Sequence, residues 1–255
     1  MVQLCRIQPL QVASVDSRGV WLQSGDESIH LPLREAPDAA PGDSLEVFVY
    51  LDPTGRLQAT LREPLAQAGE FASLTVRSVS PHGAFLDWGL PKDLLAPYAL
   101  QPERMQPGRS YLVRVCVDER GRPYADARIE EALEHDLAGL SEGDGVTLTV
   151  WQLTDLGAKV VVNDRFPGLL YRDELPPGVV PGVRLKGYVK RVRDDGKLDV
   201  TTRKVGAEGA AEARDALLAS LRAHGGFLPL SDSSSPEEIR SALDMSKKSF
   251  KKALG

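Results

Sequence analysis

The sequence predicts a mainly β fold, with three five-stranded barrels of the OB type in tandem followed by a small helical module. Three observations support this prediction. A hairpin pattern occurs three times, at residues 50–63, 115–131 and 188–204. A second, strand-turn-strand pattern precedes each hairpin. The last fifty residues then change from alternating apolar positions to helical spacing, which marks a different kind of module.

The hairpin copies share a turn and a following arginine. Alternating apolar residues flank a turn built on Asp and Gly, which is typical of a β-hairpin with one solvent-facing side. Each copy also follows a Pro-Gly pair. The copies align on the turn glycine and on an arginine seven positions later: Gly55 and Arg62, Gly121 and Arg128, Gly196 and Arg203.

The upstream pattern supplies the other strands. In each copy a strand leads into a turn that contains a glycine, Gly19, Gly83 or Gly157, and a second strand follows. A short third strand is expected at "SIHLPL", "DLLAPY" or "GLLYRD". Five strands per copy suit a small closed barrel, whose closure removes exposed sheet edges. The predicted barrels span residues 1–64, 65–134 and 135–205.

Residues 206–255 are predicted to be helical. An alanine- and leucine-rich run over 208–226 ends at a Gly-Gly pair. Ser235, Pro236 and Glu238 then form a capping box around a second helix, and Ser246 caps a basic third one. Two short helices joined by a tight turn outline a winged-helix-type module. A wing hairpin would follow, and because the chain ends at Gly255 we expect it to be missing.

Composition and charge narrow the function. The hydrophobic content of 42% and the charged content of 26% are ordinary for a globular protein. No stretch approaches the roughly 20 apolar residues of a membrane helix, so we expect a cytoplasmic protein with no membrane partner. Cys5 and Cys116 lie in apolar strands and are expected to be buried, reduced thiols. The net charge is -5, but the four predicted domains carry -4, -2, +1 and 0, so a polyanion is expected to bind the C-terminal half.

Several segments resemble a known RNA-binding motif. Gly83-Ala84-Phe85-Leu86, "VDERGR" at 117–122 and "GLLYRDEL" at 168–175 are similar to the ribosomal S-one motif. Three such barrels followed by a winged helix resemble the conserved virulence factor B family of bacterial RNA-binding regulators. The resemblance implies non-catalytic binding of single-stranded RNA in post-transcriptional or translational regulation. It implies no cofactor and no metal, with the ribosome or RNA-processing proteins as further partners.

Transferring the motif position by position shows that no copy is complete. The two motif aromatics fall on Arg18 and Trp21, His82 and Phe85, and Leu156 and Lys159. The motif histidine falls on Leu31, Ala96 and Tyr171. The motif aspartate falls on Asp52, Asp118 and Arg193, and the basic residue after the turn glycine is Arg56, Arg122 or Lys197.

The candidate RNA-binding residues are rings that can stack on bases, cations that can follow phosphates, and the motif aspartate of the second copy. Trp21 and Phe85 either face solvent or fill their barrels, and Trp151 is expected in the core. The acidic first barrel is expected to be a spacer or a protein-docking module. The candidates are His82, Phe85, Trp88, Asp118, Arg122, Lys159, Phe166, Tyr171, Arg172, Lys186, Lys190, Arg191, Arg193, Lys197, Lys247, Lys248, Lys251 and Lys252.

The sequence contains little that indicates a catalytic site. The four histidines are far apart, no nucleophile or phosphate-loop motif occurs, and the carboxylates concentrate in hairpin turns. Two alternatives to RNA binding stay open. One is a DNA-binding transcription regulator that uses the C-terminal helices. The other is a protein-interaction scaffold on the ribosome or on a degradation machine.

Overall fold

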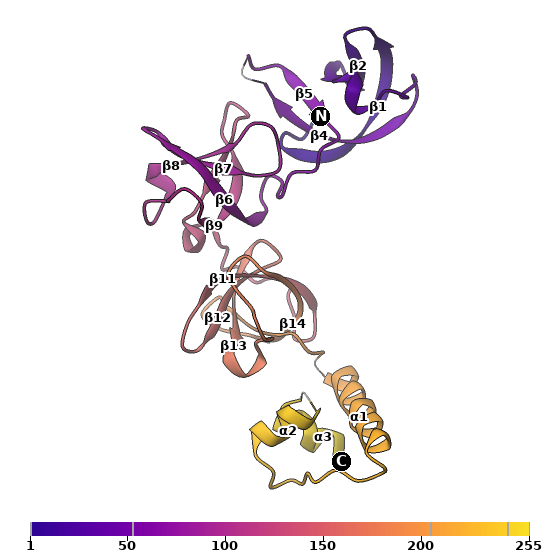
Figure 1. The fold of residues 1–255 in the computed structure, drawn as a ribbon, viewed down its shortest axis with the longest axis vertical. Helices are drawn as coiled ribbons and strands as arrows, with labels where there is room; N and C mark the ends of the chain where they lie inside the picture. The colour runs from indigo at the N-terminus through magenta and orange to yellow at the C-terminus, as the bar shows by residue number, and fades with distance from the viewer. Residues whose placement is uncertain (1, 53, 205, 244, 255) are drawn as a thin grey trace. The chain divides into compact units, whose positions relative to one another are not determined.

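The computed structural model describes residues 2–52, 54–204, 206–243 and 245–254, without the side chains of residues 206–210, 212 and 248. It contains three successive β-units and a helical module, as predicted (Figure 1). The strands are β1 (Arg6–Asp16), β2 (Gly19–Ser24), β3 (Glu27–Leu31), β4 (Ser44–Leu51), β5 (Leu57–Thr60), β6 (Phe71–Ser80), β7 (Gly83–Asp87), β8 (Leu94–Pro97), β9 (Ser110–Val117), β10 (Pro123–Asp126), β11 (Gly145–Leu153), β12 (Gly157–Val162), β13 (Phe166–Tyr171), β14 (Arg184–Val192) and β15 (Leu198–Thr201).

The first and third units are closed barrels. Their strand orders are β1-β2-β3-β5-β4 and β11-β12-β13-β15-β14, and the third and fifth strands of each unit pair in parallel to complete the closure. The first strand of every unit carries a register shift, after Val12, Val76 and Val150. Such bulges bend a strand and help it to serve two neighbours. A short 3-10 helix follows the third strand each time, at Leu33–Glu35, Tyr98–Leu100 and Arg172–Glu174.

The second unit differs in its closure. Its sheet order is β10-β9-β6-β7-β8, and no ladder joins β8 to β10 among the residues that the structure describes, although the two strands lie next to one another. The position that pairs in parallel as Leu198 in the third barrel is Pro123 in the second. Proline has no N–H to donate, which removes one bond of the parallel ladder. The second barrel is therefore closed by packing at this seam.

The glycine of each upstream pattern is required by a close approach. A side chain built at Gly83 would lie 2.9 Å from the backbone carbon of Ala96, and its equivalent at Gly157 would lie 2.8 Å from the Cα of Tyr171. The first turn of each barrel thus crosses directly over the third strand. This contact explains why the glycine recurs in all three copies.

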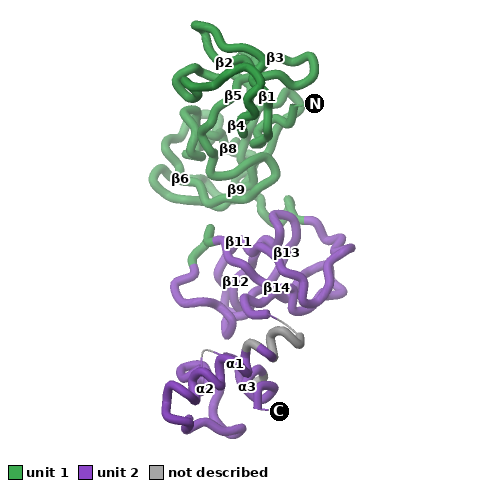
Figure 2. Tube along the Cα trace, turned by 90° about the vertical axis from the view of Figure 1, so that its right-hand side faces the viewer, with its two compact units in different colours: residues 1–133, 180–183 green, residues 134–179, 184–255 purple. Residues whose placement is uncertain are grey.

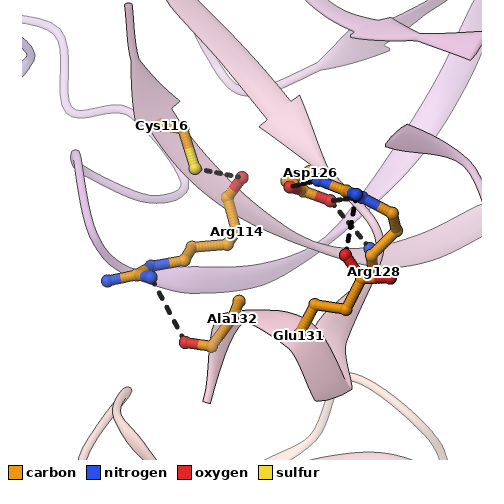
Figure 3. A network of polar contacts seen from close by, with 6 residues as sticks. All are labelled: Arg114, Cys116, Asp126, Arg128, Glu131 and Ala132. Atoms are coloured by element: carbon orange, nitrogen blue, oxygen red, sulfur yellow. Dashed lines mark hydrogen bonds and ion pairs between the residues drawn. The ribbon is translucent and has the colours of Figure 1, made fainter. Parts of the chain in front are cut away.

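In the second barrel the recurring arginine ties the last strand to the helix that follows it. In the second unit Arg128 donates to Asp126 at 2.9 Å and pairs with Glu131 at 2.7 Å, which joins β10 to the 3-10 helix Ile129–Ala132 (Figure 3). Arg114 of β9 donates to the carbonyl of Ala132 at 3.3 Å and so holds the other end of this helix. The hairpin pattern therefore has a structural part that needs no ligand.

We expect Arg128→Ala to loosen this corner. The variant loses the guanidinium contacts with Asp126 and Glu131, which join β10 to the 3-10 helix. Hydrogen–deuterium exchange of the β9 and β10 amides should become faster. Arg128→Lys keeps the charge but loses the planar guanidinium group. Its exchange rates should therefore lie between those of the unsubstituted chain and those of Arg128→Ala. Equal protection in all three proteins would contradict this role.

The chain divides into two compact units (Figure 2). Residues 1–133 with 180–183 form one unit, and residues 134–179 with 184–255 form the other. The compact unit of residues 1–133 and 180–183 holds the first two barrels, and one hydrophobic cluster contains residues of both. It includes Cys5 and Phe48 of the first barrel and Leu74, Leu86 and Trp88 of the second. These two barrels are therefore packed against one another.

The helical module consists of α1 (Gly206–Ala223), α2 (Pro236–Leu243) and α3 (Lys247–Leu254). Both predicted caps are confirmed. The amide of Glu238 donates to the Ser235 hydroxyl at 3.2 Å while the Ser235 amide donates to the Glu238 carboxylate at 2.7 Å, and the Ser249 amide donates to the Ser246 hydroxyl. Ile239 and Phe250 are buried in a small core with Leu217, Met245 and Ala253.

Candidate nucleic-acid interface

Strand register places one outward-facing row of side chains across each closed barrel. In the first barrel Ser14 lies opposite Trp21, Trp21 opposite His30, and His30 opposite Gln58. We call Arg18, Trp21, His30 and Gln58 the platform, since Arg18 of the β1–β2 turn covers the same row. Val20 and Leu22 on either side of Trp21 are fully buried, so alternation turns the indole ring outward.

The platform is held by its own contacts. The edge of the His30 ring meets Trp21 with 5.2 Å between ring centroids, and the Arg18 guanidinium lies 5.6 Å from the Trp21 ring centroid. His30 Nε2 lies 2.9 Å from the Arg18 carbonyl oxygen, which can only accept, so Nε2 carries a proton. His30 Nδ1 lies 2.9 Å from Gln58 Oε1. The ring of Trp21 is thus fixed before any ligand arrives.

Charge around the platform is also organised. The backbone and side chain of Arg18 donate to Asp16, and the Trp21 indole adds a weaker hydrogen bond, so the pKa of Asp16 lies below its usual value. The platform lines a cleft of about 920 Å³. The other lining residues are the exposed Glu27 and Arg56, together with Val2, Leu4, Ser28, Leu51, Gly55 and Leu57. This volume is at the upper end of the range for small-molecule sites. A ring, cations and hydrogen-bonding groups therefore converge on one concave surface.

The second barrel presents a less polar row. Phe85 lies opposite Ser78 and Leu95 and is half-buried. His82 is exposed in the preceding turn, where its amide donates to the Ser80 hydroxyl. Phe85 therefore retains some accessible ring surface.

The predicted roles of Trp88 and Phe166 are wrong, because both rings are buried. Trp88 is only 3% exposed, donates its indole N–H to the Lys92 carbonyl at 2.6 Å, and meets Phe48 edge to face. Phe166 is 5% exposed and packs in the core of the third barrel. Neither ring offers a face on which a base could stack.

In the third barrel the central outward position is a cation. Lys159 lies opposite Gln152 and Leu169, and its ammonium group lies 4.8 Å from the centroid of the Trp151 ring. Trp151 was expected in the core, but it sits at the strand bulge and is half-exposed. Its ring and Lys159 form a second aromatic and cationic surface.

Tyr171 at the end of β13 is half-buried and donates its hydroxyl to Asp199 at 3.2 Å. The Lys190 ammonium lies 5.7 Å from the Tyr171 ring centroid and pairs with Glu174 at 2.5 Å. Burial opposes the charge on Lys190, but the hydrogen bond and charge of Glu174 outweigh it and raise the pKa of this lysine. A small cleft of about 430 Å³ adjoins Tyr171, and it is lined by Arg191 and Arg193 as well as by three aspartates.

The remaining candidate cations are dispersed. Arg193 pairs with Asp195 at 2.9 Å and lies 3.7 Å from Asp199, and Arg172 lies 3.7 Å from Asp155. Lys248 lies outside the residues whose side chains are described. The other members, Lys186, Arg191, Lys197, Lys251 and Lys252, are exposed, while Lys247 is half-buried. Tyr171, Lys190, Arg191 and Arg193 come together, and the α3 lysines form a separate group.

Asp118 and Arg122 bind one another. One Asp118 oxygen accepts hydrogen bonds from the backbone amides of Arg120 and Arg122. The other accepts from the Arg122 guanidinium, with 2.7 Å between the oxygen and the nearest guanidinium nitrogen. The backbone hydrogen bond from Arg122, followed by that from its side chain, lowers the pKa of Asp118. This motif pair therefore holds the β9–β10 turn in shape.

None of the four platform residues is among the sequence candidates, although Arg18 and Trp21 fell on the motif aromatics and Trp21 was left open between facing solvent and filling its barrel. Alternation contained the signal for His30, because its neighbours Ile29 and Leu31 are both fully buried. The assignment of the motif histidine to Tyr171 is also displaced by one residue. In the strand ladders Gly157 pairs with Tyr171, and the equivalent Gly83 pairs with Pro97. Tyr171 is therefore equivalent to Pro97, and the residue equivalent to Ala96 is Leu170.

No group of three or more His, Cys, Asp or Glu side chains that could hold a metal ion occurs among the residues described. Within the same residues, no helix is long and apolar enough to cross a membrane.

Comparisons with known proteins agree with this architecture. The model of the S1 domain matches residues 6–62, and that of the CvfB-like winged helix domain matches residues 215–255. The protein YitL of Bacillus subtilis, described as uncharacterized, is 31% identical over 246 residues, covering 93% of this chain and 83% of YitL. Conserved virulence factor B of Staphylococcus aureus is 23% identical over 222 residues, covering 84% and 74% of the two chains.

One solved structure is also similar to this chain. It is a multidomain protein with nucleic acid binding domains from Streptococcus pneumoniae, with a TM-score of 0.45 and 23% identity. The match covers 99% of this chain and 92% of that one.

Proposed function

The chain belongs to the conserved virulence factor B family, and from this premise we propose that it binds single-stranded RNA on its barrels without catalysing a reaction. The observation that carries the proposal is the platform of the first barrel, which lies inside the segment matched by the S1 domain model. An unpaired base has an apolar face, and a fixed indole beside cations suits both that face and the adjoining phosphate.

The other barrels supply further contacts in this proposal. Phe85 in the second barrel and Tyr171 and Trp151 in the third offer partly exposed rings. Stacking tolerates any base, so a protein built on such rings binds many sequences. This tolerance suits post-transcriptional or translational regulation, which is the role we propose. The first barrel, which was expected from its charge to be a spacer or a protein-docking module, is the main binding barrel in this proposal.

The C-terminal helices favour a second candidate, the binding of duplex DNA. Helix α3 carries Lys251 and Lys252 exposed on a module matched by the winged-helix model. In helix-turn-helix proteins the second helix of the pair enters the major groove. Competition between a DNA duplex and a single-stranded RNA of equal length separates the two functions. Preference for the duplex would favour DNA binding.

A salt titration tests RNA binding directly. The observed affinity for homopolymeric single-stranded RNA should fall linearly with salt on logarithmic axes, with a slope of about -0.7 for each phosphate neutralised. Three to five contacts on the barrels would give a slope of about -2 to -3.5. Failure to bind single-stranded RNA even at low salt would contradict the proposal.

A further inference from the structure

The cleft of the first barrel is lined by two kinds of residue. Besides the platform, three apolar residues line it, and we call Val2, Leu4 and Leu51 the wall. The wall is distinctive because Leu4 packs against the hydrophobic cluster that contains the core of the second barrel as well as against the cluster of the first. Its position therefore depends on how the two barrels pack.

The β9–β10 turn of the second barrel lies directly against this wall. A Cβ atom built on Gly121 would lie 2.5 Å from Leu4 Cδ1 and 2.7 Å from Leu51 Cδ1. Atoms this close would overlap, so the two leucine methyl groups occupy the space that a side chain would need. Gly121 also has φ +75°, a conformation that favours glycine. A side chain at this position would therefore push the two leucine methyl groups away from the turn.

The contact between the barrels is continuous and well bonded. Phe48 and Trp88 meet edge to face with 5.7 Å between ring centroids. In the connecting segment, the amide of Ala68 donates to the Cys5 carbonyl at 2.8 Å and the amide of Gly69 donates to the Val115 carbonyl at 2.7 Å. The connection is thus bonded to both barrels. Such an interface holds the turn of the second barrel in place beside the cleft of the first.

The equivalent turns in the other barrels show that this contact is specific. No described atom comes within 4 Å of a Cβ built at Gly55 in the first barrel. At Gly196 in the third barrel, the nearest atom belongs to the backbone of His135, in the segment that precedes that barrel. The three turn glycines therefore have different neighbours, and of the three it is Gly121 that contacts Leu4 and Leu51.

We infer that the cleft is a composite site in which the β9–β10 turn of the second barrel positions the apolar wall for an unpaired nucleotide held on the platform. The wall contacts the base or ribose through its methyl groups, while the platform supplies stacking and charge. Asp118 and Arg122 act as positioning residues, since their mutual contacts keep the turn in the shape that meets Leu4 and Leu51. This inference rests on the proposed binding of single-stranded RNA.

Gly121→Leu tests the inference in the full chain. The new side chain displaces the wall, and we expect the affinity for a short fluorescein-labelled oligouridylate to fall at least about tenfold. The slope of affinity against salt should stay unchanged, because the wall carries no charge. Gly108→Leu is the matched control. Gly108 has nearly the same φ, +80°, but no described atom lies within 4 Å of its Cβ position, so its affinity should stay within about twofold of the unsubstituted chain.

The outcomes distinguish this inference from the proposed function. If the natural chain binds the oligonucleotide through Trp21 but the correctly folded Gly121→Leu variant binds as tightly, the composite site is wrong and RNA binding stands. If the natural chain does not bind, the proposed function itself fails.

A measurement on the natural chain avoids any folding defect. Addition of the oligouridylate should slow amide hydrogen exchange in the 118–122 turn as well as in residues 18–31, because a ligand against the wall restrains both barrels. Protection confined to residues 18–31 would overturn the composite site.

Discussion

Trp21→Ala is expected to weaken binding of a short unstructured RNA by about 1–3 kcal/mol, which is about five- to 150-fold. The indole ring supplies the stacking surface of the platform, and alanine leaves His30 and Arg18 without the ring that they contact. The fold should survive, because Trp21 projects outward between the buried Val20 and Leu22. Fluorescence anisotropy with a labelled oligonucleotide measures the loss.

Two variants complete this test. Trp21→Tyr keeps an aromatic face and should recover most of the affinity. Phe227→Ala removes the most exposed of the large hydrophobic residues that the structure describes, 72% exposed and outside the barrels, and should have little effect. Equal loss in Trp21→Ala and Phe227→Ala would mean that the platform has no special part in binding.

The sequence was sufficient for the fold because each local feature has a local cause. A glycine is needed where a turn crosses a carbonyl, as at Gly83, and an Asp-Gly turn with alternating neighbours can only form a hairpin. The capping box at Ser235 and Glu238 depends on residues three positions apart. None of these features requires knowledge of distant parts of the chain.

The candidate site was less predictable because its side chains depend on tertiary contacts. Trp21 lies between two buried residues inside a strand, so alternation determines its direction. Trp88 follows the end of β7, where alternation no longer applies, and it is buried by Phe48 of the other barrel. Lys190 similarly reads as a free cation in the sequence, whereas Glu174, sixteen positions away, pairs with it. Contacts of this kind arise only once the strands are placed.

The buried tryptophan leads to the second large effect. Trp88→Ala is expected to destabilise the packing of the first two barrels by about 3–5 kcal/mol, the usual cost of removing a large buried ring. The substitution opens a cavity beside Phe48 and leaves the Lys92 carbonyl without its indole donor. The same chemical change should therefore have different effects at the two positions. Trp21→Ala should lower the affinity for RNA, and Trp88→Ala should lower the stability of the packing between the barrels.

The alkylation rate of Cys5 measures how often the packing between the two barrels opens. Its thiol is fully buried in the cluster shared by the two barrels, and burial raises its pKa to about 11, so it should react slowly with iodoacetamide. In a Cys116→Ser background, Trp88→Ala should accelerate alkylation of Cys5 by about two to three and a half orders of magnitude, since each 1.4 kcal/mol is worth tenfold in the open population. Phe166→Ala removes an equally buried ring from the other unit and should leave Cys5 protected. If Cys5 stayed as slow in Trp88→Ala as in Phe166→Ala, the two barrels would not depend on this ring for their packing, and the β9–β10 turn would need another support.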